Sequence, residues 1–178
     1  MTAEDNSQHP VWEVYDAYRT ARLNFKYLCA KLSFNRRCNF VIEFALALTT
    51  SSSAAALWIW NTPLGQTVWK TLIVVSAFLA VLKPLLKLTD RVAHLEEAVA
   101  KWRSLEYDLY RIVRGIRRSK AFTQKLERAF DATLDKAHDL DIKTIEPSVN
   151  EKLRRKCADA VNREMPAAKF YVPPQEVQ

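Results

Sequence analysis

The chain has 178 residues, 49% of them hydrophobic, and a formal net charge of +7, which is enough for one domain of ordinary size. Its two glycines, Gly65 and Gly115, are too few for the glycine-rich loops that hold nucleotide phosphates, so the common nucleotide enzymes are excluded. Cys29, Cys38 and Cys157 lack CxxC spacing, which argues against a disulfide framework and a structural zinc site and favours a reducing environment.

The N-terminal residues are polar and acidic, without the basic and apolar regions of a signal peptide. We expect residues 1–9 to be disordered and any membrane segment to be an internal anchor. The mean hydropathy of −0.20 averages two different regions. Apolar residues concentrate between Phe40 and Leu88, and charged residues lie on both flanks.

Residues 10–38 carry apolar side chains at alternating steps of three and four, the spacing of one helix face. These residues are Val11, Val14, Tyr18, Ala21, Phe25, Leu28 and Leu32. Pro10 precedes them, and proline is favoured in a first helical turn. The pattern predicts a cytoplasmic amphipathic helix that leads into the apolar middle of the chain.

Residues 39–88 contain two long apolar segments. Asn39–Trp60 has one charge, Glu43, and as a helix would extend about 33 Å, enough to cross a bilayer. Asn61–Thr67 has the turn residues proline and glycine, and Val68–Leu88 follows, with its lysines near its ends. The pattern predicts a transmembrane hairpin of two helices.

The flanks of the two segments predict their orientation. Trp58, Trp60 and Trp69 lie around the turn, as in an aromatic belt. Basic residues flank the outer ends of both segments and are absent from the turn: Lys26, Lys31, Arg36, Arg37, Lys87, Arg91, Lys101 and Arg103. The positive-inside rule therefore predicts cytoplasmic termini. The alternative is a soluble helical protein with a very apolar buried hairpin.

Residues 89–146 continue the helical pattern. The repeat comprises Leu85, Leu88, Val92, Leu95, Val99, Trp102, Leu105, Leu109, Ile112 and Ile116. We expect this stripe to pack against the one in residues 10–38 as a cytoplasmic stalk, because each is otherwise exposed. A further helix is predicted from Phe122 to about His138, and residues 147–178 are predicted to form an amphipathic helix and a proline-rich extended tail.

Small and polar residues in the first segment suggest two functional surfaces. A pore stripe would comprise Glu43, Ala47, Thr50 and Ala54. A helix-packing surface would comprise Ala45, Thr49, Ser51, Ser53 and Ala55, since small residues let helices approach closely in lipid. A charge inside a span is a functional candidate. The alternative for Glu43 is an ion pair with Arg36, Arg37 or Lys83 at the interface.

The densest basic cluster comprises Arg111, Arg114, Arg117, Arg118 and Lys120. It suits a phosphate-bearing ligand or a protein partner, and the alternative is a solvated helix face. A net positive charge suits an anionic membrane surface as well as it suits a nucleic acid. The charge alone therefore predicts no specific nucleic-acid binding.

No catalytic constellation is evident. His94 lacks a nucleophile at a defined spacing, and His138, Asp139 and Asp141 are too few for a metal site. We therefore expect no enzyme activity, no metal and no cofactor.

The amphipathic segment "YDAYRTARLNFKYLCAKLSFNRR", the two-span hairpin and the long segment "LKPLLKLTDRVAHLEEAVAKWRSLEYDLYRI" together resemble the SLATT family of bacterial two-transmembrane effectors. The resemblance covers about residues 10–140 and lies in architecture rather than in an invariant motif. It implies an effector of prokaryotic conflict systems that forms pores or disrupts membranes, often beside nucleotide-signal synthases or sensors.

Two functional hypotheses follow. The first is a homo-oligomer in the bacterial inner membrane that forms a pore or perturbs membrane integrity in antiphage defence, in response to a cytosolic partner or a nucleotide signal. The second is a non-conducting membrane scaffold that recruits a cytosolic partner through its stalk and basic C-terminal region.

Overall fold

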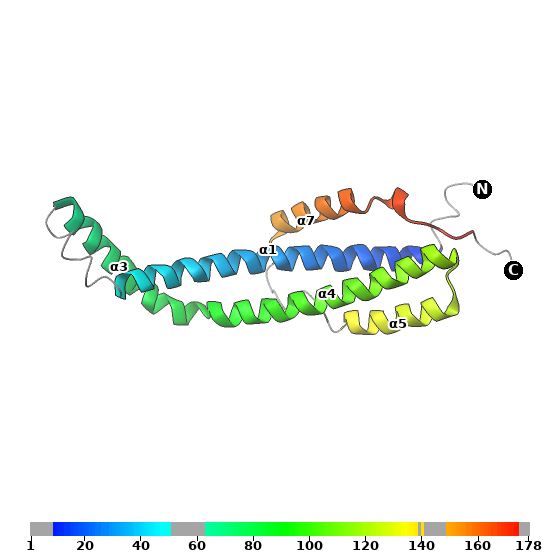
Figure 1. Ribbon diagram of the computed structural model, residues 1–178, viewed down its shortest axis with the longest axis horizontal. Coiled ribbons are helices and arrows are strands. Elements are labelled where there is room, and N and C mark those ends of the chain that lie inside the picture. Colours follow the sequence, from blue (N-terminus) through cyan, green and yellow to red (C-terminus); the bar gives the residue numbers. More distant parts are fainter. Residues whose placement is uncertain (1–8, 51–62, 139, 141–148, 175–178) are drawn as a thin grey trace. The chain divides into compact units, whose positions relative to one another are not determined.

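The computed structural model describes residues 9–50, 63–138, 140 and 149–174. This part of the chain contains helices and no strand, which confirms the predicted all-α class. It forms six helices, and Figure 1 shows their arrangement along the chain. They are α1 (Val11–Thr50), α3 (Pro63–Leu86), α4 (Leu88–Ser119), α5 (Gln124–His138), α7 (Glu151–Glu164) and the short 3-10 helix η2 (Ala167–Lys169).

The chain divides into two compact units. One consists of Met1–Ala30 and Leu95–Gln178, and the other of Lys31–His94. We call the first the bundle and the second the apolar unit. Helices α1 and α4 each contribute residues to both units, whereas α5 and α7 belong to the bundle and α3 belongs to the apolar unit.

Helix α1 begins where the sequence predicts a helix start. The backbone N–H of Val11 donates to His9 Nδ1 at 3.2 Å, and that of Trp12 donates to the His9 carbonyl at 2.9 Å, so His9 satisfies donors that a first helical turn leaves without partners. The helix then runs without a break to Thr50. It therefore joins the predicted amphipathic helix and the first part of the predicted span Asn39–Trp60 in one element, and residues 51–60 lie outside the described part.

The predicted turn at Asn61–Thr67 is wrong in its second half. Helix α3 starts at Pro63 and includes Gly65, because proline fits the first helical position, where its missing N–H is not needed. The sequence also predicted an unbroken stripe through Leu85 and Leu88. The structure instead breaks the helix at Lys87, whose φ of 44° is in the left-handed region, a conformation typical of helix C-termini.

Helix α4 ends in the same way. Lys120 has a φ of 54°, and the Ser119 hydroxyl lies within donating distance of two carbonyls, that of Gly115 at 3.0 Å and that of Ala121 at 2.7 Å. Helix α5 then packs back on α4 at Gly115, where an added Cβ would lie 2.7 Å from Leu126 Cδ2. The absence of a side chain at Gly115 thus lets Leu126 approach the helix closely.

Most residues of the two apolar stripes, predicted in residues 10–38 and 89–146, are buried in the core of the bundle. On α1, Val11, Val14, Ala21 and Leu28 are buried. On α4 the buried hydrophobic residues of the bundle are Leu95, Ala98, Trp102, Leu105, Leu109, Ile112, Val113 and Ile116. Tyr18 of α1 and Tyr110 of α4 have ring centroids 6.3 Å apart, so α1 and α4 pack together along these faces.

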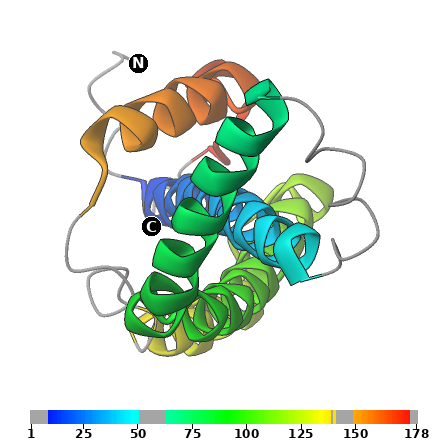
Figure 2. The ribbon, with the colours of Figure 1, turned by 90° about the vertical axis from the view of Figure 1, so that its left-hand side faces the viewer.

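Helix α1 has a second buried face that its sequence pattern does not reveal. Tyr15 and Tyr27 are 0% and 1% exposed. The Tyr15 ring stacks on Phe170 with centroids 4.2 Å apart, and the Tyr27 hydroxyl accepts a hydrogen bond from the Asn150 backbone N–H at 3.0 Å. Helix α7 and the residues after it therefore cover α1 on this side, and Figures 1 and 2 both show α7 beside α1 and α5 beside α4.

The termini of α7 are also set by local hydrogen bonds. Asn150 is its N-cap, with a side-chain oxygen that accepts from the Leu153 backbone N–H at 3.1 Å, as N-cap residues do. Cys157 and Val161 are its buried residues. Helix α7 thus lies within residues 147–178, where the sequence predicts an amphipathic helix, and it buries one side.

Within the described ranges, no helix is sufficiently long and apolar to pass through a membrane.

Candidate functional site

The apolar unit displays large hydrophobic side chains on its surface. Among the described residues of the chain, twelve large hydrophobic side chains are exposed, and nine of them belong to this unit. These nine are Phe34, Phe40, Val41, Phe44, Val68, Val74, Val75, Phe78 and Val81. Soluble monomers rarely expose large contiguous apolar patches, and such patches mark membrane or protein contacts.

Helix α3 shows this exposure around most of its circumference. Its only charged residues are Lys70 and Lys83, and Ser76 is the only buried one among its described side chains. Val74 and Phe78 are 69% and 64% exposed. A helix that is hydrophobic all round normally lies inside a protein core or a membrane, so α3 has the composition of a buried helix and the exposure of a surface helix.

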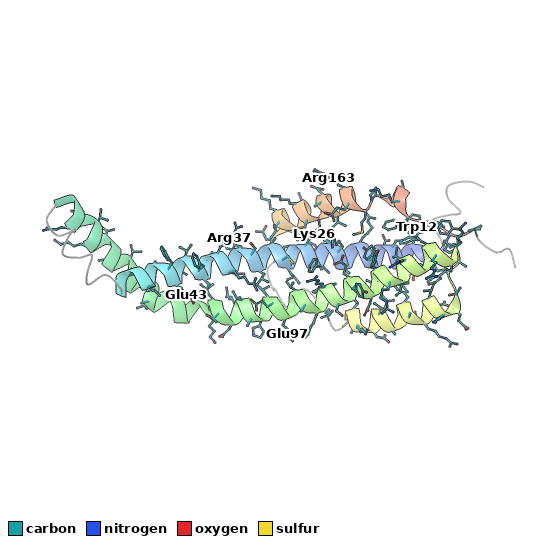
Figure 3. The ribbon with its side chains drawn as sticks, in the orientation of Figure 1. Trp12, Lys26, Arg37, Glu43, Glu97 and Arg163 are labelled. Carbon is teal, nitrogen blue, oxygen red and sulfur yellow. The ribbon has the colours of Figure 1, made fainter. Side chains whose placement is uncertain are left out.

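The predicted pore stripe is described only in part. Glu43 and Ala47 are exposed on α1, and the Glu43 carboxylate accepts a hydrogen bond from Asn39 Nδ2 at 3.1 Å. Figure 3 shows where Glu43 lies on the helix. Thr50 is the last residue of α1, and Ala54 lies outside the described residues.

The predicted helix-packing surface is described to a similar extent. Ala45 is half-buried on α1, and Thr49 lies in the last turn of the same helix. Ser51, Ser53 and Ala55 lie outside the described residues. The pore stripe and the packing surface stay predictions.

A polar network that the sequence analysis missed joins three helices of the bundle. Arg22 of α1 donates to Glu106 of α4 at 2.7 Å and to Glu164 of α7 at 3.4 Å. The Glu106 side chain is 13% exposed and that of Arg22 is 31% exposed. Burial opposes the charged guanidinium, but the two carboxylates outweigh it and raise the pKa of Arg22. Arg22 is therefore a charged link between α4 and α7.

Glu164 has a second partner on α1. Lys26 donates to the Glu164 carboxylate, and Arg19 donates to Asn162 Oδ1 at 2.6 Å. The hydrogen bond from Lys26 is the largest influence that lowers the pKa of Glu164. Figure 3 shows Lys26 on α1 and Arg163 on α7. In the sequence, this network is indicated only by the spacing of Arg19, Arg22 and Lys26, which are three and four residues apart on α1.

The residues of the predicted basic cluster differ in their contacts. Arg111, Arg114, Arg117, Arg118 and Lys120 are all exposed. Arg117, however, donates to the Lys169 carbonyl at 2.9 Å, so it binds the C-terminal segment. Lys120 directly follows α4, and its carbonyl accepts a hydrogen bond from the Tyr171 hydroxyl at 3.5 Å. Arg111, Arg114 and Arg118 are left as the outward part of the cluster.

The residues considered for metal or thiol chemistry are described in part. Over the described ranges, no group of three or more His, Cys, Asp or Glu side chains is placed to hold a metal ion, and Asp139 and Asp141 lie outside those ranges. Burial raises the pKa of the Cys29 and Cys157 thiols. Both thiols are therefore disfavoured as thiolates, the form in which cysteine reacts.

Searches with this chain against protein-family models, curated proteins and solved structures gave no significant match.

Proposed function

We propose that this protein is an oligomeric effector of the bacterial inner membrane that forms a pore or perturbs membrane integrity in antiphage defence. In this proposal residues 39–88 form a two-span hairpin and the bundle lies in the cytoplasm. Two lines support it: the resemblance of the sequence to the SLATT family, and the surface of the apolar unit.

The surface of the apolar unit is the observation that carries the proposal. Fully burying a Val or Phe side chain is worth about 1.5–3 kcal/mol, so contact of the nine exposed side chains with lipid would contribute on the order of 10 kcal/mol. The bundle has its own buried core and exposes three large hydrophobic residues, Tyr107, Tyr110 and Leu134, among those described. The contrast between the units supports a membrane-facing and a water-facing part.

The exposed positions on α1 support an oligomer with Glu43 toward a pore. Glu43 and Ala47 are one helical turn apart and both exposed. An acidic side chain in a pore favours cations, because rings of carboxylates select cations in channels. In the proposed oligomer, the small residues Ala45, Thr49 and Ser51 form the contacts between neighbouring helices.

Ion flux from vesicles tests this function. The purified full-length protein is expected to release potassium from liposomes of bacterial lipid composition, and Glu43→Gln is expected to reduce the preference for potassium over chloride. Thr50→Leu should lower conductance with the oligomer intact, whereas Ser51→Leu should break the oligomer. Vesicles that stay tight while the protein is inserted would contradict the pore and favour the non-conducting scaffold.

A further inference from the structure

From Arg103 to Arg118, the outward face of α4 carries only arginine and tyrosine among its long side chains. Six exposed residues make up this face, which we call the Arg/Tyr face: Arg103, Tyr107, Tyr110, Arg111, Arg114 and Arg118. Tyr110 lies at its edge toward α1, where its ring contacts Tyr18, and the other five follow one another at steps of three or four. Tyr107 is 62% exposed and Tyr110 is 44% exposed. Residues at this spacing lie on one side of a helix, here over a length of about 22 Å.

The two acidic residues between Arg103 and Arg118 point toward the neighbouring helices α1 and α5. Glu106 pairs with Arg22 of α1 at 2.7 Å, and Asp108 pairs with Lys136 of α5 at 3.1 Å. Within the described part of the chain, none of the four arginines of the Arg/Tyr face has an ion pair with a carboxylate. The face therefore presents four positive charges that no described acidic side chain neutralises.

The neighbours of α4 decide which class of partner fits. Helices α1 and α5 flank it on two sides (Figure 1), through the Arg22–Glu106 and Lys136–Asp108 pairs. A single helix is about 10–12 Å wide, which is close to the width of the major groove of DNA, about 12 Å. Helix α4 together with its two neighbours is broader than the groove. Insertion of α4 into the major groove of DNA is therefore disfavoured.

A bilayer surface is a less suitable partner for the Arg/Tyr face than a protein is. A helix that lies on a membrane inserts an apolar face between the lipids. The apolar face of α4 in the bundle, which includes Leu105, Leu109 and Ile112, is already buried. A protein surface needs no such insertion.

We propose that the Arg/Tyr face is the docking surface for an acidic helix of a partner protein. Arginine and tyrosine are the residue types that dominate binding energy at protein interfaces, and their spacing along α4 is the one at which two helices pack side by side. A second copy of this chain cannot dock through the same face, because arginines would oppose arginines. The inference does not depend on the pore, since all six residues belong to the bundle.

Binding of an acidic helical peptide tests the proposal. The full-length protein in nanodiscs of zwitterionic lipid is titrated into a fluorescein-labelled amphipathic helix built from Glu, Ala and Leu, and anisotropy is measured. We expect saturable binding that weakens at least about tenfold in Arg111→Glu/Arg114→Glu. Tyr107→Ala is expected to weaken it by about fivefold or more, although this change leaves the charge of the protein unaltered.

The control variant is Lys152→Glu/Arg155→Glu, which makes the same charge change on exposed residues of α7. It is expected to change the peptide affinity less than about twofold at 0.15 M salt, where exposed charges are screened beyond about 8 Å. Circular dichroism of each variant verifies that it is folded. Absent saturable binding, or an equal loss in the control, overturns the proposal. So does tighter binding of a dT oligonucleotide or of anionic vesicles through the same residues.

Discussion

Aspartate in place of Phe78 is expected to weaken the association of the full-length protein with membranes. Phe78 is 64% exposed on α3. On a surface that faces water, such a change usually alters stability by less than about 0.5 kcal/mol. At the centre of a membrane-spanning helix, an aspartate costs about 2.5–3.5 kcal/mol. The two environments therefore predict clearly different results for the same substitution.

The double variant Val74→Asp/Phe78→Asp should show the larger effect, because both residues are exposed and lie one helical turn apart on α3. Flotation of the protein with liposomes measures the bound fraction. Leu134→Asp is the matched control, since Leu134 is 41% exposed on α5 of the bundle, and this variant is expected to float like the original. If Val74→Asp/Phe78→Asp floats as well as the control, α3 does not lie in lipid.

Alanine in place of Tyr15 is expected to destabilise the bundle by about 3–5 kcal/mol, as for other fully buried aromatic residues. Its ring stacks on Phe170 and makes an edge contact with Trp12, whose centroid is 5.8 Å away. Its hydroxyl donates to the Tyr171 carbonyl at 2.5 Å. Burial raises the pKa of Tyr15, and Arg117 opposes that rise, so the hydroxyl keeps the proton that it donates.

Tyr15→Phe separates the ring from the hydrogen bond. It keeps the stacking and should cost about 1 kcal/mol, the usual net value of one hydrogen bond. Urea unfolding of the full-length protein, followed by tryptophan fluorescence, measures both variants, with Thr20→Ala at an exposed position of α1 as the control. Equal losses for Tyr15→Ala and Tyr15→Phe would show that the stack on Phe170 does not hold the C-terminal segment.

The helices of the bundle could be predicted from the sequence because one-sided burial leaves a periodic pattern. The stripe from Leu95 to Ile116 predicts α4, and the residues from Phe122 to about His138 predict α5, which the structure places at Gln124–His138. Helix ends were harder to predict, since Lys87 and Lys120 adopt positive φ values that the sequence does not mark with glycine or asparagine.

The second buried face of α1 could not be predicted, because it depends on a segment more than a hundred residues away. Tyr15 and Tyr27 fall outside the stripe of Val11, Val14 and Ala21, and their partners Phe170 and Asn150 come from the end of the chain. A tyrosine pattern on one helix does not identify a partner at such a separation. The Arg22 network was missed for the same reason, since Glu106 and Glu164 lie on two other helices.

Residues of the basic cluster that are neighbours in the sequence have different contacts in the structure. Arg117 and Arg118 are neighbours, but Arg117 bonds to the Lys169 carbonyl, whereas Arg118 lies on the outward face of α4. The tyrosines that complete this face, Tyr107 and Tyr110, stand out only once α1 and α5 are known to cover the other sides of the helix.

The depth of α3 in a bilayer is the most direct measurement of the central proposal. Spin labels are attached to full-length protein in lipid vesicles, in a variant without the native cysteines, at Phe78→Cys on α3 and at Leu134→Cys on α5. The account predicts that the label on α3 collides often with oxygen and rarely with a water-soluble nickel complex, and that the label on α5 shows the reverse. Equal access of nickel to both labels would contradict the proposal that the apolar unit lies in the membrane.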